Sequence, residues 1–319
     1  MIFVGVSHTE VYVSARYVIE QAINSSENFK PEYPENDDKQ REIAAGFKAL
    51  SEAGFDCCAG CVDGMLIWTH QPDAEHAEDL GVGPTKSYCA RKGKFGLNLQ
   101  AVCDHQYRFL DLSILYGRSS SDIVAFEASS IRQELEKPGF LADRLCLFGD
   151  NAYANRRNTM ATPFPNNGTY NFYHSQVRIR IEYAFGILCQ RWGFLRQNKA
   201  PQMFGVKKII ATVNCLCKLH NYLIDRNPIN ARNVPTHSAS DEFAMEINGA
   251  VPMKKRPGAN FMVPDQLMGA GKHFDDDPDC QRRLVSKRYD PEMLPRSNML
   301  THIMEEDLRR PIRSSFKVI

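Results

Sequence analysis

Three acidic residues stand in or directly after apolar segments of this chain, and they constrain how it can fold. Asp63 lies inside the run GCVDGMLIW, Asp150 follows the run LCLFG, and Glu182 lies in the helix-like segment HSQVRIRIEYAFG. An unpaired charge inside an apolar strand is costly, so Asp63 requires a cationic partner or a metal ion. Asp150 follows a strand of the buried type, at the carboxyl edge where open α/β sheets bind ligands. The sequence therefore predicts that the three carboxylates converge in one cleft.

Carboxylates supplied by separate elements are typical of sites for hard divalent cations. Magnesium prefers oxygen ligands at about 2.1 Å, often one or two carboxylates and a substrate phosphate. Two such ions about 4 Å apart can hold a scissile phosphate between them. An isolated aspartate in a turn is more often a cap or a surface residue, but the apolar context of Asp63 and Asp150 argues against that alternative. The layout is that of a phosphodiester nuclease that uses two divalent cations, Mg²⁺ or Mn²⁺.

The composition narrows the class of protein. A chain of 319 residues with 43% hydrophobic content can bury a full α/β core. No run approaches the ~18 apolar residues of a membrane span, and the opening MIFVGVSHTE has no basic segment before its apolar stretch, so we expect neither insertion nor export. Ten cysteines without a secretory signal indicate reduced thiols in cytosol or nucleus. Because the net charge is only +1, any DNA contact must depend on local basic surface.

Residues 1–56 form the first predicted unit, a small helical segment. Ser7 and Glu10 have the spacing of a capping box, which predicts a helix from Ser7 to Ile23. One face of this helix carries Val11, Ala15, Val18, Ile19 and Ala22. The phrase GVSHTEV resembles the turn and second helix of a helix-turn-helix unit, although an ordinary packing helix is an equal alternative. A polar linker, Pro31–Asp38, precedes a second helix that ends near Ala53.

Residues 57–226 form the second predicted unit, in which strands alternate with helices. The expected strands are Cys61–Trp68, Gly96–Cys103, Arg108–Leu115 and Arg144–Phe148, with a hairpin loop at Asp104–Tyr107. The expected helices begin near Ser120, Phe172 and Phe204. Strand, hairpin, helix, strand, helix is the order of a ribonuclease H-like α/β fold, a mixed sheet flanked by helices. That order places the three acids on the first strand, just past the fourth strand and on a late helix.

Residues 227–319 form a third range, rich in Pro, Asn, Ser and charge, and we expect a largely irregular polar tail. Met253–Pro257 (MKKRP) is either a nuclear localisation patch or a solvated run of charge. Two groups, Cys58 with Cys61 and Cys215 with Cys217 and His220, lack a convincing second ligand pair, so core thiols are expected there instead of a zinc site.

Basic residues bracket the three acids and define a candidate DNA channel. In such a channel, arginine and lysine neutralise the phosphates. The residues expected to bind DNA are Arg91, Lys92, Lys94, Arg178, Arg180 and Arg191. Aromatic residues such as Tyr153 and Trp192 lie between these basic groups. The alternative is that the charges only keep the surface soluble.

The segment from about Cys57 to Arg226 resembles the catalytic domain of Harbinger-type (P instability factor-like) DDE transposases and the cellular genes derived from them. The resemblance rests on phrases that occur in family order: CVDGMLIW, YCARKGKFGLNLQAVCD, RFLDLSI, GRSSSDIVAF, LFGDNAY, YNFYHSQVRIRIEYAFG and CKLHNYLID. A string of such phrases across half the chain is far more specific than any one motif. Two departures stand out, because Cys189 replaces a basic residue of many relatives and the chain opens inside the family's helix-turn-helix region.

The resemblance assigns roles to individual residues. Asp63, Asp150 and Glu182 match the catalytic DDE acids, and Asp122 matches a fourth acid often treated as part of the metal site. Arg178 lies one helical turn before Glu182, where it could contact a phosphate or orient the glutamate. His220 and Asn221 belong to the family phrase KLHN and are expected to have a structural role at a helix end and no chemical role.

Two functional readings follow. The first is a metal-dependent DDE endonuclease or transposase that acts on DNA as a homo-oligomer. We expect it in the nucleus, with the cytoplasm as a further location, and a separate DNA-binding partner protein is a further option. The second is a domesticated or truncated descendant that is catalytically silent and binds DNA or protein. The intact set of three acids favours the first reading, whereas the incomplete helix-turn-helix favours the second.

Overall fold

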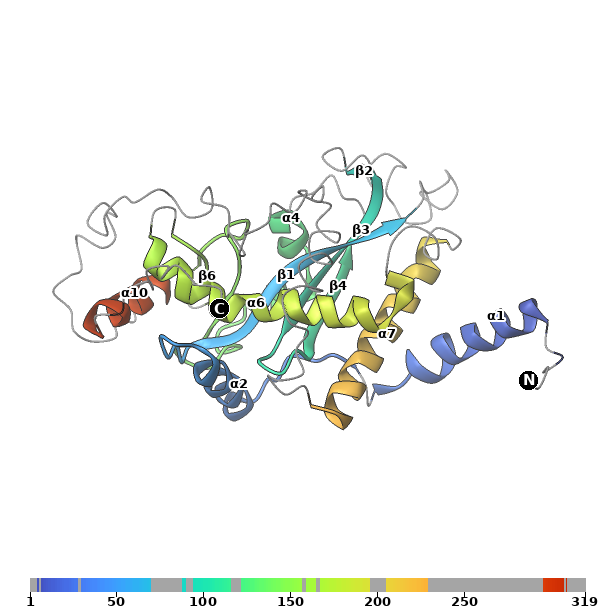
Figure 1. The fold of residues 1–319 in the computed structure, drawn as a ribbon, viewed down its shortest axis with the longest axis horizontal. Helices are drawn as coiled ribbons and strands as arrows, with labels where there is room; N and C mark the ends of the chain where they lie inside the picture. Colours follow the sequence, from blue (N-terminus) through green and yellow to red (C-terminus); the bar gives the residue numbers. More distant parts are fainter. Residues whose placement is uncertain are drawn as a thin grey trace, which may run out of the picture.

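The computed structural model describes residues 5, 7–27, 30–69, 88–89, 94–115, 122–156, 159–164, 167–195, 205–228, 295–306 and 308. Within these residues the chain forms a mixed α/β structure in which helices flank one sheet (Figure 1). No helix among them is long and apolar enough to cross a membrane.

The sheet contains six described strands in the order β2-β3-β1-β5-β6, and β4 also pairs with β3. The strands are β1 Cys58–Thr69, β2 Tyr88–Cys89, β3 Lys94–Cys103, β4 Phe109–Leu115, β5 Cys146–Phe148 and β6 Met160–Ala161. β1, β2 and β4 each run antiparallel to β3, whereas β5 runs parallel to both β1 and β6. The predicted hairpin between β3 and β4 is confirmed: Tyr107, at φ 69°, donates its backbone N–H to the carbonyl of Asp104.

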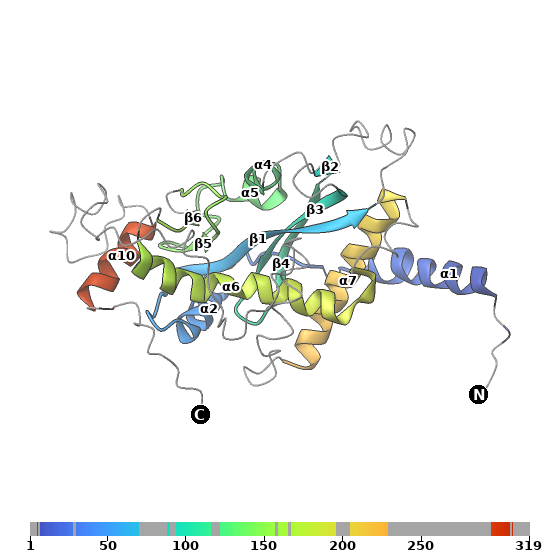
Figure 2. The same ribbon diagram turned by 45° about the horizontal axis from the view of Figure 1, so that its top comes forward.

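The two faces of the sheet are covered by different helices. Figure 2 shows α6 (Gly168–Arg191) and α7 (Val206–Arg226) on one face, with α4 (Asp122–Glu127) and α5 (Ser130–Glu134) on the other. Because side chains alternate along a strand, Asp63 and Gly64 of β1 point to opposite faces. The α6 face contains the fully buried Val177 and Ile181. Helix α2 (Asp37–Leu50) packs against β1 through Ile43, Ala44 and Phe47.

The first helix is shorter than predicted and is exposed. The Ser7–Glu10 capping box is confirmed, but the α-helix α1 (His8–Tyr17) ends at Tyr17 and the π-helix η1 (Val18–Ile23) continues the segment. At the C-terminal end of η1, Nζ of Lys218 on α7 donates hydrogen bonds to the carbonyls of Ile23, Asn24 and Ser26. Helix α1 itself projects from the body (Figure 1), and Val11 and Val18 of its predicted apolar face are 56% and 47% exposed.

Three further differences separate the structure from the expected elements. The helix expected from Ser120 is two short helices, because Ser129 caps α5 by accepting from the backbone N–H of Arg132. The two-residue strands β2 and β6 were not predicted. Helix α10 (Pro295–Glu305) lies within the range expected to be largely irregular, and its Met299, Leu300 and Ile303 are buried in the core.

Candidate functional site

The guanidinium of Arg178 contacts two of the three acids directly. Its Nη1 lies 3.6 Å from Oδ2 of Asp63 on β1, and its Nη2 lies 2.6 Å from Oε1 of Glu182 on the next turn of α6. The Arg178 side chain is only 18% exposed and that of Asp63 21%, so both charges are largely removed from water. Arg178 is therefore a cationic partner of the kind that the buried position of Asp63 requires.

Asp150 lies directly after β5, in a turn that its own side chain stabilises. Its Oδ1 accepts from the backbone N–H of Ala152 at 2.8 Å, and its carbonyl accepts from the N–H of Tyr153. Burial raises its pKa, Ala152 and Arg178 oppose that rise, and the charges of Asp122 and Glu182 add to it. Asp150 thus shares an electrostatic environment with Arg178 and Glu182.

The site carries more negative charge than Arg178 balances. Burial raises the pKa of Asp63 to about 8; Arg178 lowers that pKa, whereas Asp150 and Glu182 raise it further. Burial disfavours the charge of Arg178, but Glu182, Asp63 and Asp150 outweigh it and raise the arginine pKa. Three acids around one arginine leave an excess of carboxylate oxygens, which an additional cation would stabilise.

This donor set fits divalent cations. Carboxylate oxygens are the ligands that Mg²⁺ and Mn²⁺ prefer, and the pKa of Asp63, raised mainly by burial, is raised further by the charges of Asp150 and Glu182. Among the residues that the structure describes, no three carboxylate, histidine or cysteine side chains are already arranged to hold a metal ion. Since the Arg178 guanidinium contacts both Asp63 and Glu182, binding of a cation between those carboxylates requires the guanidinium to move.

The structure places the fourth acid, Asp122, on the face of the sheet opposite to that of Asp63. Asp122, at the start of α4, accepts at Oδ1 from Nδ2 of Asn98 at 3.2 Å. Asn98 and Gln100 of β3 share the face of Gly64, and Asp63 pairs in register with Ala101 on the other face. The polar residues Asn98 and Gln100 were missed by sequence reasoning, although their alternation within the apolar run GLNLQAVC was a usable signal.

Of the basic residues expected to bind DNA, Arg178, Arg180 and Arg191 all lie on α6. Arg180 lies two positions beyond Arg178, which on a helix points it to a different side. There it opposes the burial-driven rise in the pKa of Tyr107, in the β3–β4 hairpin. Lys94 begins β3, whereas Arg91 and Lys92 lie outside the described residues.

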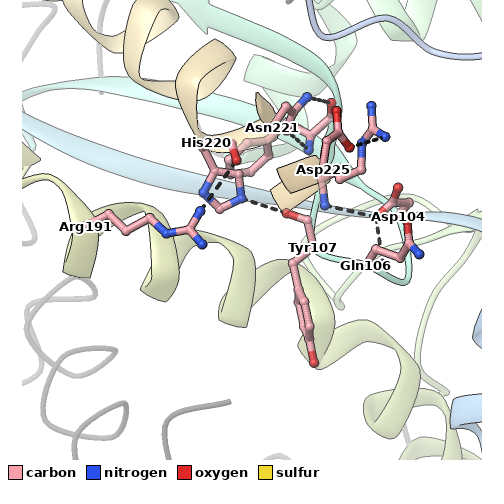
Figure 3. A network of polar contacts seen from close by, with 9 residues as sticks. Asp104, Gln106, Tyr107, Arg191, His220, Asn221 and Asp225 are labelled. Carbon is pink, nitrogen blue, oxygen red and sulfur yellow. Dashed lines mark hydrogen bonds and ion pairs between the residues drawn. The ribbon is translucent and has the colours of Figure 1, made fainter. Parts of the chain in front are cut away.

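Arg191, at the end of α6, is joined to a polar network between α7 and the hairpin (Figure 3). Its Nη1 donates to the carbonyl of His220 at 3.5 Å, and Nε2 of His220 donates to the carbonyl of Tyr107 at 2.8 Å. Asn221 exchanges two hydrogen bonds with the backbone of Phe109. Burial lowers the pKa of His220 to about 4, so its imidazole is neutral and acts as a structural donor.

The cysteines of the two groups noted in the sequence are buried. Cys58, Cys61, Cys215 and Cys217 are free thiols within the folded body, as predicted for core residues. The Sγ atoms of Cys58 and Cys61 lie 3.9 Å apart on β1. Burial raises the pKa of Cys217 and that of Cys58 well above their usual values, so neither is a reactive thiolate.

Comparison with known protein families relates most of the strands and helices described above to a known family. Residues 62–221 match the family described as DDE superfamily endonuclease. The matched range contains Asp63, Asp122, Asp150, Arg178 and Glu182. No curated protein and no solved structure matches the chain.

Proposed function

This chain belongs to the DDE superfamily endonucleases, and we propose that it is a divalent-metal-dependent nuclease of the Harbinger transposase type, built on a ribonuclease H-like domain. The observation that carries this proposal is the meeting of Asp63 and Glu182 on one guanidinium, with Asp150 acting electrostatically on both. Three acids from a strand, a post-strand turn and a late helix match the layout of a site that cleaves phosphodiester bonds.

Asp63, Asp150 and Glu182 would hold the divalent cations that enzymes of this family generally use. When bound, such ions activate a water or a 3′-hydroxyl and stabilise the leaving oxygen. The turn after β5 orients Asp150 through the Ala152 hydrogen bond. Before a cation binds, Arg178 orients Glu182 through their contact at 2.6 Å. Once the guanidinium has moved to admit the cation, its N–H groups would suit a substrate phosphate.

We propose duplex DNA as the substrate and the nucleus as the site of action. Lys94, Arg180 and Arg191, together with Arg91 and Lys92, would contact the DNA backbone, because phosphate neutralisation supplies most of sequence-independent affinity. A homo-oligomer on DNA and a separate DNA-binding partner are further parts of the proposal, both drawn from the resemblance to Harbinger transposases.

Cleavage of supercoiled and linear duplex DNA with Mn²⁺ tests the proposal. We expect the parent chain to nick DNA and Asp63→Ala to lose at least about 100-fold in rate while it stays folded and bound to DNA, because the residue would hold metal and does not build the basic surface. The matched control is Asp225→Ala, which removes a surface carboxylate paired with Arg108 and should leave cleavage unchanged. Equal rates for Asp63→Ala and the parent would refute a catalytic role for Asp63.

One observation favours a second candidate function, a catalytically silent DNA- or protein-binding protein. Arg178 already contacts Asp63 and Glu182, so the acids have a counter-ion without any metal. Binding of DNA without cleavage in both Mg²⁺ and Mn²⁺, with no rise in melting temperature on adding either ion, would support this alternative.

A further inference from the structure

A chain of hydrogen bonds crosses the sheet face that lies opposite Asp63. The hydroxyl of Tyr153 donates to Oε1 of Gln100 at 2.8 Å, and Nε2 of Gln100 donates to Oδ1 of Asn98 at 2.9 Å. Nδ2 of Asn98 then donates to Oδ1 of Asp122 at 3.2 Å. Each amide accepts on its oxygen and donates from its nitrogen, so all three bonds point toward the Asp122 carboxylate. Bonds aligned in this way polarise and strengthen one another.

The members of this relay are shielded from water. Asn98, Gln100 and Tyr153 are 1%, 2% and 4% exposed, so each would be costly to leave without a partner. The Tyr153 ring also packs edge-on against Phe126 of α4, with ring centroids 5.4 Å apart. The relay therefore joins α4, β3 and the turn after β5.

Gly64 makes room for the relay beside Asp63. A Cβ at position 64 would press on Nε2 of Gln100, and it would lie 2.9 Å from Oδ1 of Asp122 and 3.3 Å from Oδ1 of Asn98. Three relay members therefore converge over the backbone of the residue that follows Asp63. The absence of a side chain at Gly64 lets them lie against β1.

The other end of the relay reaches the turn that carries Asp150. Tyr153 donates its backbone N–H to the carbonyl of Asp150, and the Ala152 N–H binds the Asp150 carboxylate. The phenol of Tyr153 is anchored by Gln100, so the relay restrains this turn from the far side of the sheet.

We propose that Asp122 is a positioning residue and not a metal ligand: it ends a relay through Asn98, Gln100 and Tyr153 that holds the Asp150 turn in place. This inference rests on the proposed function, because Asp150 is there assigned to the metal. It assigns Asp122 a role different from that of the other three acids. Asp122 lies on the α4 face and accepts from Asn98, whereas Asp63 and Glu182 meet on Arg178 at the α6 face.

Two substitutions at Asp122 separate a positioning role from a ligand role. Asp122→Asn keeps an oxygen that can accept from Asn98 but is a poor ligand for Mn²⁺, whereas Asp122→Ala removes the acceptor altogether. We expect Asp122→Asn to keep the Mn²⁺ affinity of the full chain within about twofold of the parent, and Asp122→Ala to weaken it about tenfold, the usual effect of losing an outer-shell partner. The affinity is measured by calorimetry and from the spectrum of free Mn²⁺. A loss of Mn²⁺ affinity in Asp122→Asn as large as the loss in Asp150→Asn would overturn the proposal.

Tyr153→Phe tests the distant end of the same relay. It removes one hydroxyl, and we expect it to weaken Mn²⁺ binding about tenfold, as Asp122→Ala does. The matched control is Tyr33→Phe, because Tyr33 is also buried and donates its hydroxyl, but to the carbonyl of Ala59. Tyr33→Phe should leave Mn²⁺ affinity unchanged. A folded Tyr153→Phe with parental affinity would overturn the proposal.

A readout without metal distinguishes failure of the relay from failure of the proposed function. In the chelator-treated protein, the side-chain amide NMR signals of Asn98 and Gln100 should both move in Tyr153→Phe and in Asp122→Ala, and should stay in place in Tyr33→Phe. A parent chain that binds no Mn²⁺ would refute the proposed function while these signals still support the relay. Signals that do not move in either relay variant would refute the relay itself.

Discussion

At the scale of single residues, the balance of charge around Arg178 decides how the site behaves. Asp63 has a pKa raised to about 8, mainly by burial, even though Arg178 opposes that rise. Asp150 is shifted in the same direction. A site with these properties is stabilised by protons at low pH and by added cations at high pH, so pH and metal should act on the same carboxylates.

The pH dependence of stability follows from the shift at Asp63. The unfolded chain gives this residue a pKa of about 4, whereas the folded chain gives it about 8. Between these values the folded state binds the extra proton, so the free energy of unfolding falls as pH rises. We expect the melting temperature of chelator-treated parent to fall across this range more steeply than that of Asp63→Asn.

Other titrating groups contribute equally to the curves of the parent and of Asp63→Asn, so the difference between the two curves reports on Asp63. Burial lowers the pKa of His174 to about 3 and of His220 to about 4, so both histidines oppose the trend below about pH 6.5 in parent and variant alike. Parallel curves for the two proteins would contradict the raised pKa of Asp63. Addition of Mn²⁺ should flatten the curve of the parent alone.

At the scale of elements, helix α10 packs into the core although it lies far along the chain from the elements that it contacts. Leu300 and Ile303 are 2% and 1% exposed, and Nε2 of His302 donates to the carbonyl of Ala53 at 2.8 Å. The helix lies against α6 and β6 (Figure 1), so it supports the helix that carries Arg178 and Glu182.

Truncation of a core side chain on α10 measures this support. We expect Leu300→Ala to lower the free energy of unfolding by about 2–4 kcal/mol, through lost burial and the cavity left behind. Met304→Ala on the same helix is the control, because Met304 is 37% exposed and should change stability by less than about 0.5 kcal/mol. Equal stabilities in urea unfolding would show that α10 does not dock as described.

At the scale of the whole molecule, the net charge is only +1, so the DNA binding that we propose would depend on how the basic residues are distributed. Arg191 ends α6 and contacts the carbonyl of His220, so a neighbouring element restrains it (Figure 3). Burial lowers its pKa without removing its charge at neutral pH. A restrained arginine loses less conformational entropy when it binds a phosphate.

Measurement of DNA binding at several salt concentrations tests whether Arg191 contacts a phosphate. We expect Arg191→Ala to weaken binding and to reduce the slope of log affinity against log salt by about one unit, the change for one lost phosphate contact. Arg108→Ala is the control, because Arg108 is already paired with Asp225 at 2.6 Å. Fluorescence anisotropy at several salt concentrations gives both slopes, and an unchanged slope for Arg191→Ala would place that residue outside the DNA interface.

The sequence by itself determined what depends on neighbouring residues. Alternation and apolar runs predicted strands β1, β3 and β4 and the hairpin at Asp104–Tyr107, and helical spacing predicted α6 and α7. The capping box at Ser7 was predicted correctly for the same reason, since both of its hydrogen bonds join residues three apart. Membership of the DDE superfamily, too, could be recognised from local phrases.

Only the tertiary structure decided which side chains meet across the sheet. A two-residue strand such as β6 carries no period of its own and exists because of its partner β5. The face on which Asp122 lies depends on how α4 packs against β3, which is a contact between distant segments. The exposure of Val11 likewise depends on where α1 lies relative to the rest of the fold. Arg178 reaches Asp63 because α6 crosses β1 there. Periodicity depends only on the order of nearby residues, whereas these contacts depend on how elements far apart in the chain pack together.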